Sequence, residues 1–418
     1  MILNSYLDME KFITNRKFLH LFRVIEKHGG ALRFVGGAVR DALAGVKGYD
    51  YDLATNLSPD ELMEACQEGG IKTFPIGIKF GTLGVLIDNT QLEITSLRKD
   101  IKPNGRHTEV EFTDDWIEDA SRRDLTINAV YADEHGNVFD YFNGIDDLKN
   151  GIVRFIGNPA QRIAEDYLRI LRFFRFYSAF GKTQIDEKAL KACIDNKDNL
   201  KKLSIERIRD ELIKMLNTKN VVKTLNIMFN YGILDYIFPS SNNLDKLQHL
   251  IDMVNYLQIE PSALRRLFVL YNPDENTAIN FSERLHMSKK QREPMIRWAK
   301  IQCNSEDFEN SQFIYEMVYR YGKDFCYDKL LLTYAEEMKD YKNIGAILQQ
   351  INDVNIPIFP VRGQDIINVA NIPEKYVGNI IKSLENCWIA HGFNQDKQEL
   401  LDLAIKMFNA LADIHHCA

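Results

Sequence analysis

The sequence is poor in the features that would place a chain in a membrane or in an oxidising compartment. Its six cysteines are scattered and form no C-x-x-C pair, which is typical of reduced thiols in a cytosolic protein and argues against a structural zinc site. No run approaches the roughly 20 apolar residues that a membrane-spanning helix needs. We therefore expect a cytoplasmic protein without membrane contact.

An excess of positive charge is also absent, since the formal net charge is −7. The chain as a whole does not attract nucleic acid, so any such contact has to come from local basic surface. The first residues carry acidic side chains and no continuous apolar segment. Neither a secretory signal nor a transit peptide is expected at that end.

The pattern of apolar residues changes near residue 157. Over 418 residues, with 45% hydrophobic and 27% charged side chains, we expect a globular protein of about two to four domains. Alternating, β-branched segments predict strands in the first part, at residues 31–35, 71–74, 82–87, 92–97, 127–131 and 152–156. From Pro159 onward helical spacing dominates. The fold class predicted is an α+β head, with a small mixed or antiparallel sheet, followed by an all-α remainder.

Three local signals complete this coarse picture. Ser58 and Pro59 are expected to cap and begin a helix. Residues 98–108 are charged and contain Pro103 with Asn104-Gly105, which predicts a mobile loop. Residues 139–148 are interpreted as a turn-rich connection.

A glycine pair, Gly36-Gly37, lies between a predicted strand and a predicted helix start. Backbone N–H groups without Cβ obstruction at a helix N-terminus can hold phosphate, and Arg40 lies one helical turn later. Most glycine pairs are simply turns, and most single arginines are solvated. The pair alone is therefore weak support for a phosphate site.

Asp50 and Asp52 are separated by one residue, so on a strand both carboxylates point to the same face. Such a pair can bind a hard cation such as Mg²⁺, although an exposed acidic turn is the commoner outcome. Glu93 lies inside a predicted apolar strand, where an unpaired buried acid would be costly. It is either a third carboxylate of the site or a residue on the solvent face.

Two further groups of charged residues can bind a nucleotide. Arg122-Arg123-Asp124 can contact phosphates and ribose, or can complement the end of a helix. Residues 165–180 are expected to form one helix, on which polar side chains recur every three residues. These are Asp166, Arg169, Arg172 and Arg175. Asp166 and Arg169 can offer a donor–acceptor edge to a nucleobase, whereas the structural alternative is a basic stripe facing solvent.

Taken in order, these segments resemble the class II, bacterial-type family of CCA-adding tRNA nucleotidyltransferases and poly(A) polymerases. The matching motifs are GGAVRD at 36–41, DYDLAT at 50–55, RRDLTINA at 122–129, FDYFNGIDDL at 139–148, EDYLRILR at 165–172 and SIERIRDEL at 204–212. Each motif is weak alone. Their common order is specific, and it covers about half of the chain.

The resemblance implies a role for each matched position. Asp50 and Asp52 would hold two Mg²⁺ ions, and Glu93 would be the third catalytic carboxylate. Nucleotide binding would fall to Gly36, Gly37, Arg40, Arg123, Asp124, Asn128, Asp166, Arg169, Arg172 and Arg175. Asp166 and Arg169 would pair with the Watson–Crick edge of CTP or ATP. Arg98, Asp100 and Arg106 would belong to a flexible loop used in switching from C to A.

The resemblance also implies the organisation and the activity of the chain. Residues 1–156 would be the catalytic head, 157–220 a helical neck that selects the base, 221–340 a body and 341–418 a tail that binds tRNA. The expected reaction adds C, C and A to the tRNA 3′ end from CTP and ATP. The alternatives are a poly(A) polymerase, an enzyme adding only A or only CC and, more remotely, a non-catalytic RNA- or nucleotide-binding module.

Overall fold

The computed structural model describes residues 18–46, 51–87, 90–102, 109–237, 243–355, 357–370 and 372–416. Two compact units make up the chain. The first comprises Met1–Leu244, Ser262–Leu267 and Asn280–Met287, and the second comprises Asp245–Pro261, Phe268–Ile279 and Ser288–Ala418. None of the helices in the described ranges combines the length and the apolar character that crossing a bilayer requires.

A seven-stranded mixed sheet forms the centre of the head, in the order β3-β4-β5-β2-β1-β8-β9. Its strands are β1 (Leu32–Val35), β2 (Asp52–Thr55), β3 (Lys72–Gly77), β4 (Thr82–Ile87), β5 (Thr90–Ser96), β8 (Val130–Ala132) and β9 (Val138–Asp140). β2 and β5 run parallel, and every other neighbouring pair is antiparallel. The predicted α+β head with a small mixed sheet is confirmed.

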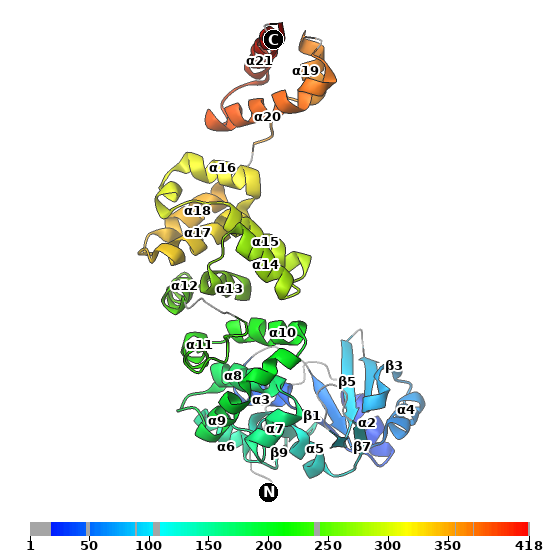
Figure 1. The fold of residues 1–418 in the computed structure, drawn as a ribbon. Coiled ribbons are helices and arrows are strands. Elements are labelled where there is room, and N and C mark those ends of the chain that lie inside the picture. The colour runs from blue at the N-terminus through cyan, green and yellow to red at the C-terminus, as the bar shows by residue number, and fades with distance from the viewer. Residues whose placement is uncertain are drawn as a thin grey trace. The chain divides into compact units, whose positions relative to one another are not determined.

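Helices cover the sheet because its strands carry apolar side chains on both faces. Phe34 and Leu53 belong to one buried cluster, whereas the next residues, Val35 and Ala54, belong to another. This is the alternation expected of a strand buried on both sides. The helical elements of the head are α2 (Phe18–Lys27), α3 (Gly37–Leu43), α4 (Pro59–Glu68), η1 (Ile78–Phe80), α5 (Trp116–Arg122), η2 (Thr126–Asn128) and α6 (Gly144–Asn150) (Figure 1). Ser58 caps α4 and Pro59 begins it, as predicted.

Helices make up the rest of the first unit. They are α7 (Pro159–Glu165), α8 (Leu168–Phe180), α9 (Glu187–Asn196), η3 (Lys197–Lys202), α10 (Ile205–Leu216) and α11 (Val221–Asn230). Phe173 and Phe174 of α8 are fully buried, and α10 packs against this helix. The apolar residues of α8 therefore fix the helix that carries three of the predicted nucleotide-binding arginines.

The later part of the chain is also helical (Figure 1). Its elements are α12 (Leu244–Tyr256), α13 (Ala263–Tyr271), α14 (Glu275–Arg284), α15 (Lys289–Lys300), η4 (Ser305–Glu309), α16 (Ser311–Tyr321), α17 (Lys323–Glu337), α18 (Ile344–Asp353), α19 (Gly363–Ala370), α20 (Glu374–Ala390) and α21 (Lys397–His416). Ile366, Leu384, Trp388 and Leu400 come from the last three of these helices and share one buried cluster. The all-α remainder is confirmed.

Several local predictions are wrong. Residues 98–102 are not an irregular loop but strand β6 (Arg98–Lys102), which pairs with β7 (Glu109–Phe112). An ion pair of 3.2 Å between Lys99 Nζ and Glu111 Oε2 joins the two strands. Because the strands are rich in such charged side chains, the alternation of apolar residues did not predict them. The turn signals at Pro103 and Asn104-Gly105 lie outside the described residues.

The segments that follow also differ from prediction. Residues 126–128 form η2, so the expected strand at 127–131 shrinks to β8. The connection at 139–148 contains the end of β9 and most of α6, because Asp140 accepts the backbone N–H groups of Gly144 and Ile145 and fixes the helix start. Residues 152–156 add no strand to the sheet and contribute only a bridge between Phe155 and Leu125.

Candidate active site

A cavity of about 510 Å³ in the first unit brings most of the predicted site residues together. We call it the arginine pocket. It is lined by Gly36, Gly37, Ala38, Arg40, Asp41, Asp52, Arg122, Arg123, Asp124, Asn128, Asp166, Arg169, Arg172, Arg175 and Phe176. Every residue predicted to bind the nucleotide belongs to this lining, together with one of the predicted metal ligands.

The glycine pair forms the entry to α3. Gly36 has a φ of 68°, a conformation that glycine adopts without strain and that other residues rarely adopt. Gly37 is the first residue of α3, so the unpaired N–H groups of the first turn lie at the pocket. This end of the helix can therefore bind phosphate oxygens.

Arg40 lies one turn along α3 and is only 8% exposed. Its Nη2 is 2.7 Å from Asp41 Oδ1, and its Nη1 donates to Asn128 Oδ1 at 2.5 Å. The guanidinium also lies 4.8 Å from the ring centres of Phe176 and Phe180. These contacts hold a buried cation in one orientation toward the pocket.

Asp52 and Glu93 lie side by side. They are register partners on the parallel strands β2 and β5, so their side chains leave the same face of the sheet. Both residues are exposed. Glu93 thus lies on the solvent face of its strand and is also next to Asp52, so the two interpretations given for it are compatible. Asp50, the other residue of the D-x-D motif, lies outside the described residues. Within the described part, no three His, Cys, Asp or Glu residues are grouped as a metal site would need.

Asp124 is buried and connects the head to α8. Its Oδ2 accepts the Nε–H of Arg172 at 2.6 Å, and its Oδ1 accepts from the Asn128 amide at 3.1 Å. Burial alone would raise the pKa of Asp124, but Arg172 outweighs burial and holds the pKa below its usual range. The residue is therefore an ionised acceptor at the pocket wall.

Arg122 and Arg123 share one buried carboxylate, Asp119, which is 1% exposed. Arg122 Nη2 lies 2.7 Å from Asp119 Oδ1, and Arg123 Nη2 lies 3.0 Å from Oδ2. Tyr131 donates its hydroxyl hydrogen to Asp119 Oδ2 at 2.8 Å, and burial raises the pKa of this phenol, which keeps it protonated. The backbone N–H of Arg98, at the root of β6, donates to the same carboxylate at 3.4 Å.

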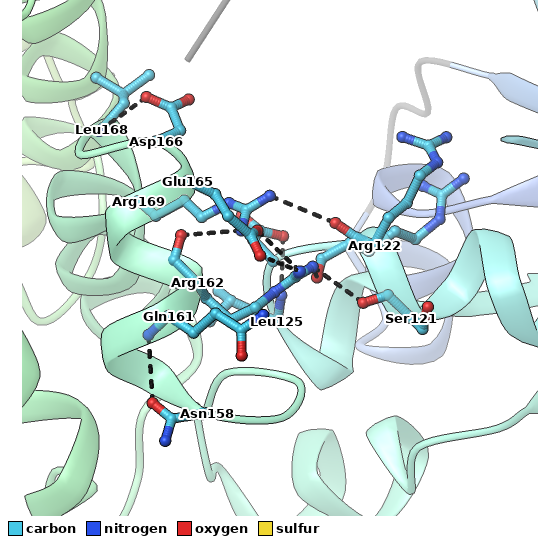
Figure 2. A network of polar contacts seen from close by, with 12 residues as sticks. Ser121, Arg122, Leu125, Asn158, Gln161, Arg162, Glu165, Asp166, Leu168 and Arg169 are labelled. Carbon is cyan, nitrogen blue, oxygen red and sulfur yellow. Dashed lines mark hydrogen bonds and ion pairs between the residues drawn. The ribbon is translucent and has the colours of Figure 1, made fainter. Parts of the chain in front are cut away.

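The predicted single helix over 165–180 is wrong at its start. Asp166 has an extended backbone, with φ of −155° and ψ of 110°, and it separates α7 from α8. Its Oδ1 accepts the backbone N–H of Leu168 at 3.1 Å, which stabilises the start of α8 (Figure 2). Arg207 of α10 donates to both Asp166 oxygens, at 3.3 and 2.7 Å. Asp166 is thus held by a residue from the SIERIRDEL motif.

Arg169 is held by two residues of α7. Its Nη1 donates to the Arg162 carbonyl at 2.9 Å and to Glu165 Oε2 at 2.5 Å. Figure 2 shows Arg162 and Arg169 reaching from α7 and α8 toward Ser121 and Arg122, whose carbonyls accept from them at 2.9 and 3.4 Å. Asp166 and Arg169 consequently line one pocket with side chains that are held by different partners.

Comparisons with known proteins agree with this geometry. Two family models match, one described as Poly A polymerase head domain over residues 32–154 and one described as probable RNA and SrmB- binding site of polymerase A over residues 183–244. The CCA tRNA nucleotidyltransferase 1, mitochondrial, of Mus musculus is 36% identical over 389 residues, which are 91% of this chain and 88% of that protein. The chain belongs to the CCA-adding tRNA nucleotidyltransferase family.

Two further members of the family extend the match. The CCA-adding enzyme of Ligilactobacillus salivarius (strain UCC118) is 30% identical over 406 residues, covering 94% of this chain and 96% of that enzyme. The fold matches the crystal structure of the Bacillus stearothermophilus CCA-adding enzyme in complex with CTP, with a TM-score of 0.79 at 22% identity, over 95% and 98% of the two chains. The predicted class II family is confirmed.

The residues that hold the family motifs in place were not predicted from the sequence. Asp119 and Tyr131 support Arg123, and Arg207 supports Asp166. Glu211 supports Arg175, since Glu211 Oε2 lies 2.6 Å from Arg175 Nε. The only signal for Asp119 was an acid one helical turn before Arg123. Arg98 and Asp100 do not line the arginine pocket, and Arg106 lies outside the described residues.

Proposed function

We propose that this chain adds C, C and A in turn to the 3′ end of tRNA, using CTP and ATP and no nucleic-acid template. The observation that carries the proposal is that residues suited to the three parts of a nucleotide, its phosphates, ribose and base, line one cavity. The start of α3 and Arg40 suit the phosphates, and Asp124 suits the ribose. Asp166 and Arg169 suit the edge of the base.

The carboxylates beside the pocket fit a divalent cation. Asp52 and Glu93 are neighbours on the sheet, and their oxygens are ligands that Mg²⁺ prefers. Together with Asp50 of the same motif they would hold two Mg²⁺ ions. Such ions supply charge neutralisation at the α-phosphate and at the leaving pyrophosphate. The protein adds positioning, with its arginines fixed in place before the nucleotide arrives.

The transfer exchanges one phosphorus–oxygen bond for another. The 3′-oxygen of tRNA forms a bond to the α-phosphorus, and the bond between that phosphorus and the oxygen bridging to the β-phosphate breaks. The leaving pyrophosphate takes the electron pair, and the hydroxyl proton passes to solvent. Arg40 and the start of α3 line the arginine pocket, and they would hold the phosphates that leave.

Selection of the base is assigned to two side chains with opposite hydrogen-bonding character. The Asp166 carboxylate accepts hydrogen bonds and the Arg169 guanidinium donates them, so together they can match the Watson–Crick edge of cytosine or adenine. Both are fixed by neighbours from other segments, Asp166 by Arg207 and Arg169 by Glu165. A fixed pair of this kind allows the protein to act as the template.

The finer assignments stay predictions. We infer that the paired strands β6 and β7, with Arg98 and Asp100, take part in the change from C to A addition; Arg106, predicted for the same role, lies outside the described residues. We also infer a head at 1–156, a neck at 157–220, a body at 221–340 and a tRNA-binding tail at 341–418. Cytoplasmic localisation stays a prediction as well, because relatives include a protein named as mitochondrial.

One experiment tests the function and separates the alternatives. Purified protein is given tRNA lacking CCA, with Mg²⁺ and with CTP, ATP or both, and the 3′ ends of the products are sequenced. We expect CC with CTP alone and CCA with both nucleotides. Only A, only CC, or a long A tract would instead identify a partial enzyme or a poly(A) polymerase. No incorporation by the wild-type protein would indicate a binding module.

Two variants make the result specific. Asp52→Ala removes a predicted metal ligand and should abolish incorporation while leaving the thermal unfolding curve unchanged. Asp114→Ala removes an exposed acid outside the pocket and should retain full activity. Activity retained in Asp52→Ala would contradict the role of this carboxylate.

A further inference from the structure

A second cavity, of about 840 Å³, adjoins the arginine pocket within the first unit. The two cavities share Arg40, Asp41, Arg175 and Phe176 in their linings. These four residues face both spaces. The second cavity therefore begins at Arg40, one turn beyond the start of α3, where the nucleotide phosphates are expected. We call it the lysine pocket, after the lysines that line it: Lys149, Lys182, Lys214 and Lys219.

The lysine pocket concentrates positive charge in an acidic protein. Six cationic side chains line it, the four lysines with Arg40 and Arg175, against one carboxylate, Asp41. That carboxylate is already paired with Arg40 at 2.7 Å. The chain as a whole has a formal net charge of −7, so this concentration is local. Cations gathered in a concave space attract multivalent anions more strongly than scattered cations do.

The four lysines make no ion pair or side-chain hydrogen bond within the described residues. Other exposed lysines of the same unit do, for example Lys191, whose Nζ lies 3.0 Å from Asp195 Oδ2. An ammonium group without a partner is available to a ligand. The lysine pocket therefore offers several uncommitted cations to one occupant.

The fold brings these lysines together from separate segments. Lys149 lies in the last turn of α6, Lys182 follows α8, Lys214 lies in α10 and Lys219 follows α10. Backbone hydrogen bonds fix the segments to one another: Lys182 N–H donates to the Gly151 carbonyl at 3.0 Å, and Asn220 N–H donates to the Ser178 carbonyl at 3.1 Å. The cluster is thus produced by tertiary structure rather than by a basic run in the sequence.

We propose that the lysine pocket binds inorganic pyrophosphate as it leaves the arginine pocket. The inference rests on the proposed function for the source of the pyrophosphate. Its physical basis is position and charge. The nucleotide phosphates are expected at the start of α3 and at Arg40, and Arg40 also lines the lysine pocket. The leaving group would therefore depart next to a cavity whose lysines, unpaired within the described part of the chain, match its concentrated negative charge.

An RNA backbone is the competing occupant, and it fits less well. RNA carries one negative charge per phosphate, spread along an extended strand, so a row of cations along a groove serves it best. Here the cations converge on one cavity that continues the site of the triphosphate. Pyrophosphate places several charges on two adjacent phosphorus centres, which suits such convergence.

The test measures pyrophosphate binding directly. Inorganic pyrophosphate is titrated calorimetrically into the full chain, without tRNA or nucleotide and with or without Mg²⁺. The variant Lys149→Ala/Lys214→Ala removes two lysines from different elements and leaves the arginine pocket unaltered. The control Lys79→Ala/Lys188→Ala removes two exposed lysines outside both cavities and changes the net charge equally.

We expect the lysine-pocket variant to bind pyrophosphate about tenfold more weakly and the control to stay within about twofold of wild type. During turnover, the inhibition constant for added pyrophosphate should rise by a similar factor, while KM for CTP changes little. Equal pyrophosphate affinity in wild type and variant would overturn the proposal. So would a loss of tRNA affinity without a loss of pyrophosphate affinity, which would identify an RNA contact. Pyrophosphate binding that depends on the lysines, in a protein that fails to add CCA, would support the pocket and refute the proposed function.

Discussion

Asp119 gives the sharpest quantitative prediction, because one buried carboxylate neutralises two arginines of the site. Its oxygens lie 2.7 Å from Arg122 Nη2 and 3.0 Å from Arg123 Nη2. The two arginine side chains are only 16% and 19% exposed, so water cannot replace the lost partner well. Asp119→Asn keeps the shape and the hydrogen bond from the Arg98 backbone but removes the charge.

The expected cost follows from leaving buried cations unpaired. Breaking a buried ion pair by removing one partner destabilises a protein by about 3–5 kcal/mol. For a unit of this size that corresponds to a fall in Tm of roughly 6–20 °C. Urea and thermal unfolding of wild type and Asp119→Asn measure both quantities. KM for CTP should also rise, because Arg123 loses the carboxylate that orients it toward the pocket.

A matched control and a double-mutant cycle complete this test. Asp114→Asn changes an exposed acid close to the same helix and should alter stability by less than about 0.5 kcal/mol. The double variant Arg122→Met/Asp119→Asn should lose less stability than the sum of the losses in the two single variants. In the double variant the Arg122 guanidinium, which Asp119→Asn alone leaves buried without its partner, is absent. An Asp119→Asn protein as stable as the Asp114→Asn protein would refute the reasoning.

Three further predictions concern the buried carboxylates, the support of Asp166 and a buried thiol. Asp119 and Asp124 have pKa values below the unfolded value of about 3.9. The stability that these two carboxylates contribute is therefore complete above that pH and is lost as pH falls further, through their folded pKa values. Urea unfolding at pH 7, 5, 4 and 3 should show this loss of stability, and the loss should be smaller in Asp119→Asn. Arg207→Ala should reduce discrimination between C and A by about tenfold and leave tRNA affinity within twofold, as single-nucleotide incorporation and filter binding would reveal, since it releases Asp166. Burial raises the pKa of Cys66 to about 11, so iodoacetamide should label this thiol only after unfolding, as peptide mass spectrometry can follow.

Local patterns predicted those parts of the fold that depend on neighbours in the sequence. Strands β4 and β5 followed from alternating β-branched residues, and the start of α4 from Ser58 and Pro59. The paired strands β6 and β7 were missed because they are charged and short, so the turn signals that lie between them in the sequence dominated. The break at Asp166 was missed because no glycine or proline interrupts the helical pattern there.

The site was predictable as a set of residues but not as an arrangement. The motifs contain most of the residues that line the arginine pocket, because their residue types carry the chemistry. Several of the contacts that hold them could not be predicted, since the partners are distant in the sequence: Arg207 lies 41 residues beyond Asp166, and Arg172, itself a predicted residue, lies 48 residues beyond its partner Asp124. Such partners depend on how α7, α8 and α10 pack, which no local pattern encodes.

The two pockets differ in how their cations are held, and that difference matches what each would bind. In the arginine pocket the guanidinium groups are tied to carboxylates from their own or other elements. These pairs are Arg40 with Asp41, Arg123 with Asp119, Arg169 with Glu165, Arg172 with Asp124 and Arg175 with Glu211. Charged groups that are fixed in advance can stabilise the charge that develops at defined positions in a transition state. Among the described residues, the lysines of the neighbouring pocket have no carboxylate partner, and their charges lie on long, flexible side chains. Cations that can adjust position suit a product that must be attracted, held briefly and released.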